Sequence, residues 1–179
     1  MTETLDARTL MERLISFPTV SRDSNLDLID FVEGYLESHG ISSARVPDAT
    51  APKASLYAHV GPQVEGGVVL SGHTDVVPVD GQAWDTDPFD VVEKGDKLYG
   101  RGTCDMKGFD ALAIWALVEA KKRGVTRPLQ LALSYDEEVG CTGAPPMIDA
   151  MLASGMPIAS TSIIGEPSMM KVVTGHKGG

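Results

Sequence analysis

The chain has 179 residues, of which 42% are hydrophobic and 22% charged, a composition typical of a folded globular domain. Its formal net charge of −10 leaves no basic stripe, which argues against a nucleic acid partner. There is no apolar run of membrane-spanning length, and the acidic first residues do not resemble a signal peptide. We therefore expect no membrane association and a cytoplasmic location.

Two helices are expected near the start of the chain. Apolar residues at helical spacing predict a helix over 5–17, closed by Pro18, and a second helix over 27–39, ended by Gly40. Alternation around a central glycine predicts a hairpin over 89–99. The short strands expected between the helices and the hairpin cover 43–46, 54–59 and 67–72.

The second half of the chain alternates strands and helices. After a glycine-rich segment over 100–108, the expected elements are helices over 109–123 and 144–153 and strands over 128–134, 162–164 and 171–173. This alternation predicts an α/β fold, with functional sites beyond the carboxyl ends of the strands. No further element follows the last expected strand, so we expect the chain to be a fragment of a longer protein.

The two cysteines, Cys104 and Cys141, are too few for a disulfide framework. They lack the CxxC spacing of a zinc finger, so we expect small buried thiols. Each lies within or beside an acidic motif, so both can line one site.

His73 and Asp75 come directly after the central strand expected at 67–72. Alternate side chains of a strand share a face, so these two can point the same way. An imidazole whose second ring nitrogen is held by a carboxylate is the usual arrangement of a metal ligand. Such a pair, taken alone, is more often a surface or hydrogen-bonded histidine, and it is the acidic segments further on that favour a metal site.

Three further segments present acids where an expected element begins or ends: Asp105, Glu137 with Glu138, and Glu166. Zinc binds imidazole and carboxylate together, and one carboxylate can bridge two ions about 3.5–4 Å apart, so the set fits a two-cation site. If the backbone at Glu137 and Glu138 is extended, one of them binds metal while the other handles protons. The alternatives are a solvated turn at this pair and a simple turn residue at Glu166, before Pro167.

The segment Gly100-Arg101-Gly102 is similar to a glycine loop that cradles phosphate. It lacks the Lys-Ser/Thr pair of a P-loop, and Asp105 would repel a phosphate. Nucleotide binding is therefore a disfavoured alternative.

Four segments, SGHTDVVPVDGQ, YGRGTCDMKGFDA, SYDEEVGCTG and GEPS, resemble in this order the dinuclear metallo-aminoacylase and carboxypeptidase family. The resemblance covers nearly the whole chain but only about the first half of a typical family member. It implies a three-layer α-β-α sandwich with a mostly parallel mixed sheet, a zinc-aminopeptidase-like catalytic domain that is incomplete here. The TCDMKGF and DEEVGC forms are closer to the deacetylase branch than to the desuccinylases. That branch removes the acetyl group from the small molecule N-acetyl-L-ornithine, giving acetate and ornithine in arginine biosynthesis.

The resemblance also implies a cofactor, namely two divalent metal ions, zinc or cobalt. His73 and Glu166 would bind one ion and Glu138 the other, with Asp105 bridging the two. Among the remaining residues of the motifs, Asp75 would orient His73.

The same resemblance implies that Glu137 is the general base. It further implies a cis peptide bond between Asp105 and Met106, just after the bridging aspartate.

The resemblance leaves two family features unaccounted for. The family takes its last metal ligand, a histidine, from the later part of the catalytic domain, and an oxyanion-stabilising histidine from an inserted lid domain through which its members homodimerise. We expect 1–174 to belong to the catalytic domain and 175–179 to begin the crossing into that lid. His176 is the one candidate ligand near this end.

We therefore expect an incomplete catalyst, with one ion bound at His73, Asp105 and Glu166 and the second site weak or empty. A desuccinylase or a metallodipeptidase with the same metal core remains an alternative. A metal-binding protein without turnover is another, although the retained Glu137 argues against it.

Overall fold

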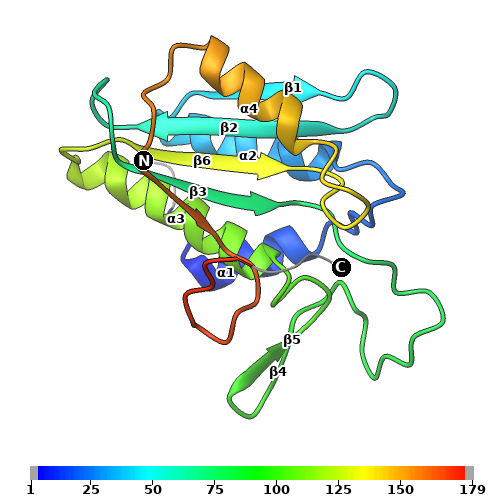
Figure 1. Cartoon of the computed structure of the whole chain (residues 1–179). Helices are drawn as coiled ribbons and strands as arrows, with labels where there is room; N and C mark the ends of the chain where they lie inside the picture. The colour runs from blue at the N-terminus through cyan, green and yellow to red at the C-terminus, as the bar shows by residue number, and fades with distance from the viewer. Residues whose placement is uncertain (1–3, 176–179) are drawn as a thin grey trace.

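The apolar segments of the chain pair into a five-stranded mixed sheet with the strand order β1-β2-β6-β3-β7. A computed structural model describes residues 4–175 and shows helices on both faces of this sheet (Figure 1). The helices are α1 (Ala7–Ile15), α2 (Leu26–Ser38), α3 (Lys107–Arg123) and α4 (Ala144–Ala153). The sheet strands are β1 (Ser43–Pro47), β2 (Ala54–Val60), β3 (Val68–His73), β6 (Leu129–Ser134) and β7 (Thr161–Ile164). The predicted hairpin forms a separate two-stranded sheet of β4 (Val92–Lys94) and β5 (Lys97–Tyr99).

Strand direction places three strand ends together. β3 pairs in parallel with both β6 and β7, whereas β2 is antiparallel to β1 and to β6. Thus β1, β6, β3 and β7 point one way and β2 runs against them. The predicted three-layer fold with a mostly parallel mixed sheet is confirmed, and the carboxyl ends of β3, β6 and β7 meet at one edge.

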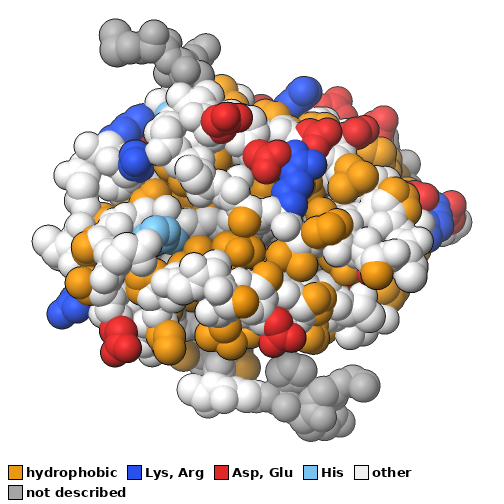
Figure 2. Space-filling view, turned by 90° about the horizontal axis from the view of Figure 1, so that it is seen from above, with side chains coloured by type: hydrophobic (Ala, Val, Ile, Leu, Met, Phe, Trp, Pro, Cys, Tyr) orange, Lys and Arg blue, Asp and Glu red, His pale blue; other side chains and the backbone are white. Residues whose placement is uncertain are grey.

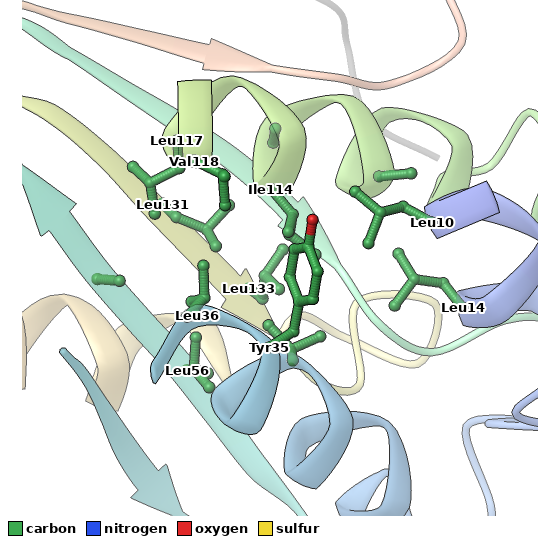
Figure 3. Close-up of a cluster of buried hydrophobic side chains, with 14 of the residues drawn as sticks. Leu10, Leu14, Tyr35, Leu36, Leu56, Ile114, Leu117, Val118, Leu131 and Leu133 are labelled. Atoms are coloured by element: carbon green, nitrogen blue, oxygen red, sulfur yellow. The ribbon is translucent and has the colours of Figure 1, made fainter. Parts of the chain in front are cut away.

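The larger core lies between the sheet and helices α1, α2 and α3. Because alternate strand residues face opposite sides, Leu56, Leu131 and Leu133 all point into this core. Figure 3 shows Leu131 beside Leu117 of α3 and Leu56 beside Leu36 of α2, with Leu10 and Leu14 of α1 further along the same cluster. This closed layer fixes β2 and β6 firmly in place.

The opposite face is covered more thinly. There α4 packs over β1, β2 and β6, and Met147 of α4 is buried against Tyr57 and Ala132. The apolar side chains Ile148 and Leu152 of α4 stay exposed, and hydrophobic side chains are visible across the face seen from above (Figure 2). All four residues of β7 are exposed, so this strand is the open side of the sheet.

One expected element is wrong. Residues 171–173 are not a strand, and Val172 and Val173 are exposed. A short apolar segment becomes a strand only where another strand accepts its backbone hydrogen bonds, and within residues 4–175 this segment pairs with none.

The remaining boundaries agree with the expectations or shift by a few residues. Helix α3 begins at Lys107, two residues before the expected 109–123. The expected boundary after residue 174 falls at the very end of the described residues, and His176 lies outside them, so neither is tested. In the part of the chain that the structure describes, every helix is too short or too polar to cross a lipid bilayer.

Candidate metal centre

His73, the last residue of β3, is the centre of the acidic cluster. Its side chain is only 1% exposed, and Nδ1 lies 3.0 Å from the backbone oxygen of Asp75 and 3.4 Å from the carboxylate Oδ1 of the same residue. An imidazole held through Nδ1 in this way turns Nε2 toward the cluster as a possible ligand. The expected proximity of His73 and Asp75 is confirmed.

Asp75 also fixes the acidic turn that follows β6. Its Oδ1 accepts a hydrogen bond from the backbone N–H of Glu137 at 3.1 Å, and its Oδ2 accepts one from that of Glu138 at 3.3 Å. Ser21 Oγ donates to the same Oδ2 at 2.6 Å. Burial alone would raise the pKa of Asp75, but the hydrogen bonds from His73 and these groups outweigh it and lower the pKa. A buried carboxylate therefore holds a histidine and two glutamates in one arrangement.

Carboxylates from three other segments face Nε2 of His73. The distances from Nε2 are 3.2 Å to Asp105 Oδ1, 3.6 Å to Glu166 Oε1 and 3.8 Å to Glu137 Oε2. Glu138 joins His73 and Asp105 in a group whose donor atoms all lie within 4.8 Å of one another. A second such group consists of His73, Glu137 and Glu166. The structure thus brings together every residue that the sequence predicted for the site.

The backbone at Glu137 and Glu138 is not the extended one that the sequence analysis had considered. Glu137 and Glu138 lie in a turn rather than in extended backbone, so both carboxylates face His73. The turn starts at Asp136, whose backbone is left-handed with φ 56°, a conformation that aspartate adopts more readily than most residues. The backbone at Glu137 and Glu138 therefore does not by itself decide which of the two is a metal ligand and which is a base.

The start of α3 positions Asp105. The peptide bond between Asp105 and Met106 is cis, as expected. Lys107, the first residue of the helix, is fully buried, and its Nζ donates to the backbone oxygens of Leu14 at 3.1 Å and Phe17 at 2.7 Å. The loop that carries Asp105 is thereby tied to the end of α1.

Glu166 is positioned by close packing between β7 and α3. It follows Gly165, where an added Cβ would lie 1.9 Å from the ring of Phe109. Only glycine allows the chain to pass so close to this ring. Glu166 thus depends on a contact that leaves no room for a side chain.

The charges around His73 act on its pKa. Burial alone would lower the pKa of the imidazole, but the hydrogen bond and charge of Asp75 outweigh it. With the added charges of Asp110 and Glu166, the pKa rises to about 10. The surrounding carboxylates therefore favour a positive charge at this position.

The carboxylates repel one another. Burial, with the charge of Asp105, raises the pKa of Glu138. Burial likewise raises the pKa of Glu166, and the charges of Asp105 and Glu137 add to it although His73 opposes the shift. Crowded carboxylates with one imidazole are a donor set that binds divalent cations, so the residues present fit a metal site.

Two buried charged residues beneath the site were missed by the sequence analysis. Asp110 lies against Gly72, where a Cβ would sit 1.9 Å from its Oδ1, and this oxygen has no hydrogen-bond partner among the described residues. Burial raises the pKa of Asp110 well above its usual value and lowers that of Lys107 to about 7. The signal was present, since both are charged residues that directly precede the apolar run 111–118 of the helix. Ser21, by contrast, carries no local signal.

The cysteine expectation is wrong in one respect. Cys104 and Cys141 are both exposed rather than buried, and each lies in a loop outside the helices and strands. Cys141 does line the site, with Sγ 3.5 Å from Glu137 Oε1.

Sequence comparison places this geometry in a family. The sequence profile described as peptidase family M20/M25/M40 matches residues 69–176. The chain belongs to this peptidase family. The expected family resemblance is thereby confirmed, and the matched region contains all the acidic motifs.

Curated relatives of this M20-family chain include acetylornithine deacetylases. It is 39% identical to that of Myxococcus xanthus over 99% of this chain and 46% of the relative. It is 38% identical to that of Pasteurella multocida over 92% of this chain and 44% of the relative. The chain therefore spans less than half the length of the curated relatives it matches.

Several solved structures share the fold. A metallo-carboxypeptidase from Sulfolobus solfataricus matches with a TM-score of 0.76 and 18% identity, over 90% of this chain and 37% of that one. Human carnosine dipeptidase 1 matches with a TM-score of 0.72 and 22% identity, over 88% and 37%. The YXEP protein of Bacillus subtilis, described as a dinuclear metal binding peptidase, matches with a TM-score of 0.61 and 19% identity, over 88% and 41%.

Proposed function

We propose that this chain forms the metal-binding part of an amide hydrolase that removes the acetyl group from N-acetyl-L-ornithine. The observation that carries the proposal is the convergence of carboxylates from three segments on Nε2 of the buried His73. The identity of 39% to the acetylornithine deacetylase of Myxococcus xanthus supports the choice of substrate.

In this proposal the site would take two divalent ions, zinc or cobalt. His73 and Glu166 would hold one ion and Glu138 the other, and Asp105 would contribute to both. Asp75 holds the neutral imidazole in the orientation that ligation needs.

Bound ions would polarise the acetyl carbonyl and lower the pKa of an attacking water molecule. Glu137 takes the proton of that water and passes it to the leaving amine, so acetate and ornithine are the products. Its side chain is 38% exposed, so solvent and substrate can reach it. Cys141 Sγ, beside Glu137 Oε1, helps to orient this carboxylate.

Substitution of Glu137 tests the role of the base. In a version of the protein extended to the length of its curated relatives, Glu137→Gln should lower kcat by about 10²–10⁴-fold, because proton transfer is lost. Metal analysis should still find the ions of the unsubstituted protein. Loss of an ion on this substitution would make Glu137 a ligand and contradict the assignment.

A substrate panel tests the specificity. N-acetylornithine should be hydrolysed faster than N-succinyl-diaminopimelate or dipeptides, and a reversed order would favour one of the alternative activities. The 179-residue chain alone should bind metal but show little turnover, because the family supplies further site histidines from later in the chain. Robust hydrolysis by this chain would contradict that expectation.

A further inference from the structure

A buried ion pair lies behind the acidic turn. Lys53, just before β2, has a side chain only 10% exposed, and its Nζ contacts Asp136 Oδ1 at 2.5 Å, where the Asp136 side chain is 17% exposed. The same Nζ donates to the backbone oxygen of Ser21. Neither Lys53 nor Ser21 falls within residues 69–176, which the family profile matches.

The ion pair closes a ring of contacts around the turn. Ser21 Oγ donates to Asp75, and Asp75 accepts the backbone N–H groups of Glu137 and Glu138. Asp136 precedes these glutamates directly, so the turn is held by Lys53 at its start and by Asp75 along its length. The position of both glutamates depends on the two anchors together.

The backbone at Lys53 is itself tied to the end of β3. The Asn25 side chain accepts a hydrogen bond from the N–H of Ala54 at 2.9 Å and donates to the backbone oxygen of the same residue at 2.8 Å. Its amide also donates to Thr74 Oγ1 at 2.9 Å, and Thr74 lies between His73 and Asp75. Through Asn25, the backbone next to Lys53 is therefore fixed relative to the backbone next to His73.

Electrostatics explain why a cation is placed there. Asp136, Glu137 and Glu138 are consecutive acids at the centre of a cluster of carboxylates. Lys53 neutralises the first of them from the protein side and leaves the other two facing His73. Removing one partner of a mostly buried pair leaves an uncompensated charge, so the turn would rearrange.

We propose that Lys53 and Asp136 form a clamp that positions the acidic turn, so that Glu138 can bind a divalent cation and Glu137 faces the same site as the base. The inference rests on the proposed function, because it concerns the same site. Each of the two three-donor groups includes one glutamate of this turn, so both depend on the clamp. Lys53 acts as a positioning residue and does not touch the cation.

The test measures cation binding by the 179-residue chain. Zn²⁺ and Co²⁺ are titrated into the metal-free protein, and the visible absorption of bound Co²⁺ reports the coordination geometry. Lys53→Met should weaken binding by about 10–100-fold, as is usual for residues that orient metal ligands, and should change the Co²⁺ spectrum. Lys53→Arg keeps the charge and should restore most of the affinity.

A matched control separates this effect from a general loss of charge. Lys122→Met removes an exposed lysine that pairs with Glu119 on α3, and it should leave Co²⁺ affinity and spectrum unchanged. Urea unfolding without metal gives the stability of each variant. A purely structural ion pair would lower that stability while the folded protein kept its Co²⁺ affinity and spectrum, which would overturn the clamp.

A second variant keeps the test decisive if Lys53→Met does not fold. Asp136→Asn removes the other charge and should weaken Co²⁺ binding similarly, with the double variant no worse than either single one. Additive losses would overturn the clamp, because they would show that the two residues act separately. Failure of the unsubstituted chain to bind Zn²⁺ or Co²⁺ would overturn the proposed function and the clamp together, whereas normal binding by Lys53→Met would overturn the clamp alone.

Discussion

The two flanks of the metal centre are built very differently. On one flank β6 is buried between helices on both faces and leads into a turn held by Asp75, Lys53 and Tyr135. On the other flank β7 is exposed along its length, and Glu166 depends on pairing with β3 and on the contact of Gly165 with Phe109. The site therefore combines one half that is packed on both sides with one half that is held by a single strand pairing and one close contact.

The largest expected effect is on the free energy of unfolding, and it comes from the difference in packing between the two flanks. Leu131→Ala in β6 removes a fully buried side chain and should lower the free energy of unfolding by about 2–5 kcal/mol. Ile164→Ala in β7, where the side chain is 64% exposed, should change it by at most about 0.5 kcal/mol. Urea unfolding of both variants checks this, and equal losses would remove the basis of the comparison.

An intermediate effect is expected at Gly165. Gly165→Ala places a Cβ against the ring of Phe109, so Glu166 should shift. Co²⁺ affinity should therefore fall, while the packing of β6 stays unchanged. Phe109→Ala in the same chain makes room for the added methyl group and should restore part of the affinity. Co²⁺ titration of the single and double variants measures this. If Gly165→Ala binds Co²⁺ normally, the β7 flank is not positioned by this contact.

The smallest expected effect concerns the anchor of Tyr135. Its hydroxyl donates to Asp48 Oδ2 at 2.8 Å, and Asp48 also accepts hydrogen bonds from the backbone of Thr50 and Ala51. These hydrogen bonds hold the pKa of Asp48 below its usual value, and the one from the Thr50 backbone has the largest effect. The stabilisation is therefore present above about pH 4, where an unfolded aspartate is ionised, and is lost as the pH falls toward the folded-state pKa.

Asp48→Asn should accordingly reduce stability slightly at pH 6 and make less difference at pH 3. Urea unfolding across this range measures the change, with Asp149→Asn on the exposed side of α4 as the control. A loss that does not depend on pH would show that the Asp48 charge contributes nothing to this anchor.

Local patterns predicted most of the fold. Helical spacing located α1 and α2, and glycines such as Gly40, with φ 69°, marked helix ends because they adopt a left-handed backbone. The direction of β2 and the strand order could not be predicted, since they depend on pairing between distant segments. The strand predicted at 171–173 failed for the same reason, because its short valine run contains no information about a partner strand.

The site divides in the same way. His73, Asp105 and Glu166 could be predicted because acids and an imidazole at element ends are unusual and because their motifs resemble a family. Ser21 and Lys53 could not, because an ordinary serine and lysine gain their role only when folding brings them behind the acidic turn. Supporting residues of this kind have no signature in one sequence.

The parallel pairing of β3 with β6 and β7 has a consequence for how the chain folds. The donor atoms come from segments that are distant along the chain, and no local hairpin or helix contains more than part of the set. Cation affinity can therefore arise only after the slow long-range pairings are complete. A cation that binds there would link these distant segments, and its binding free energy would add to the stability of the folded chain.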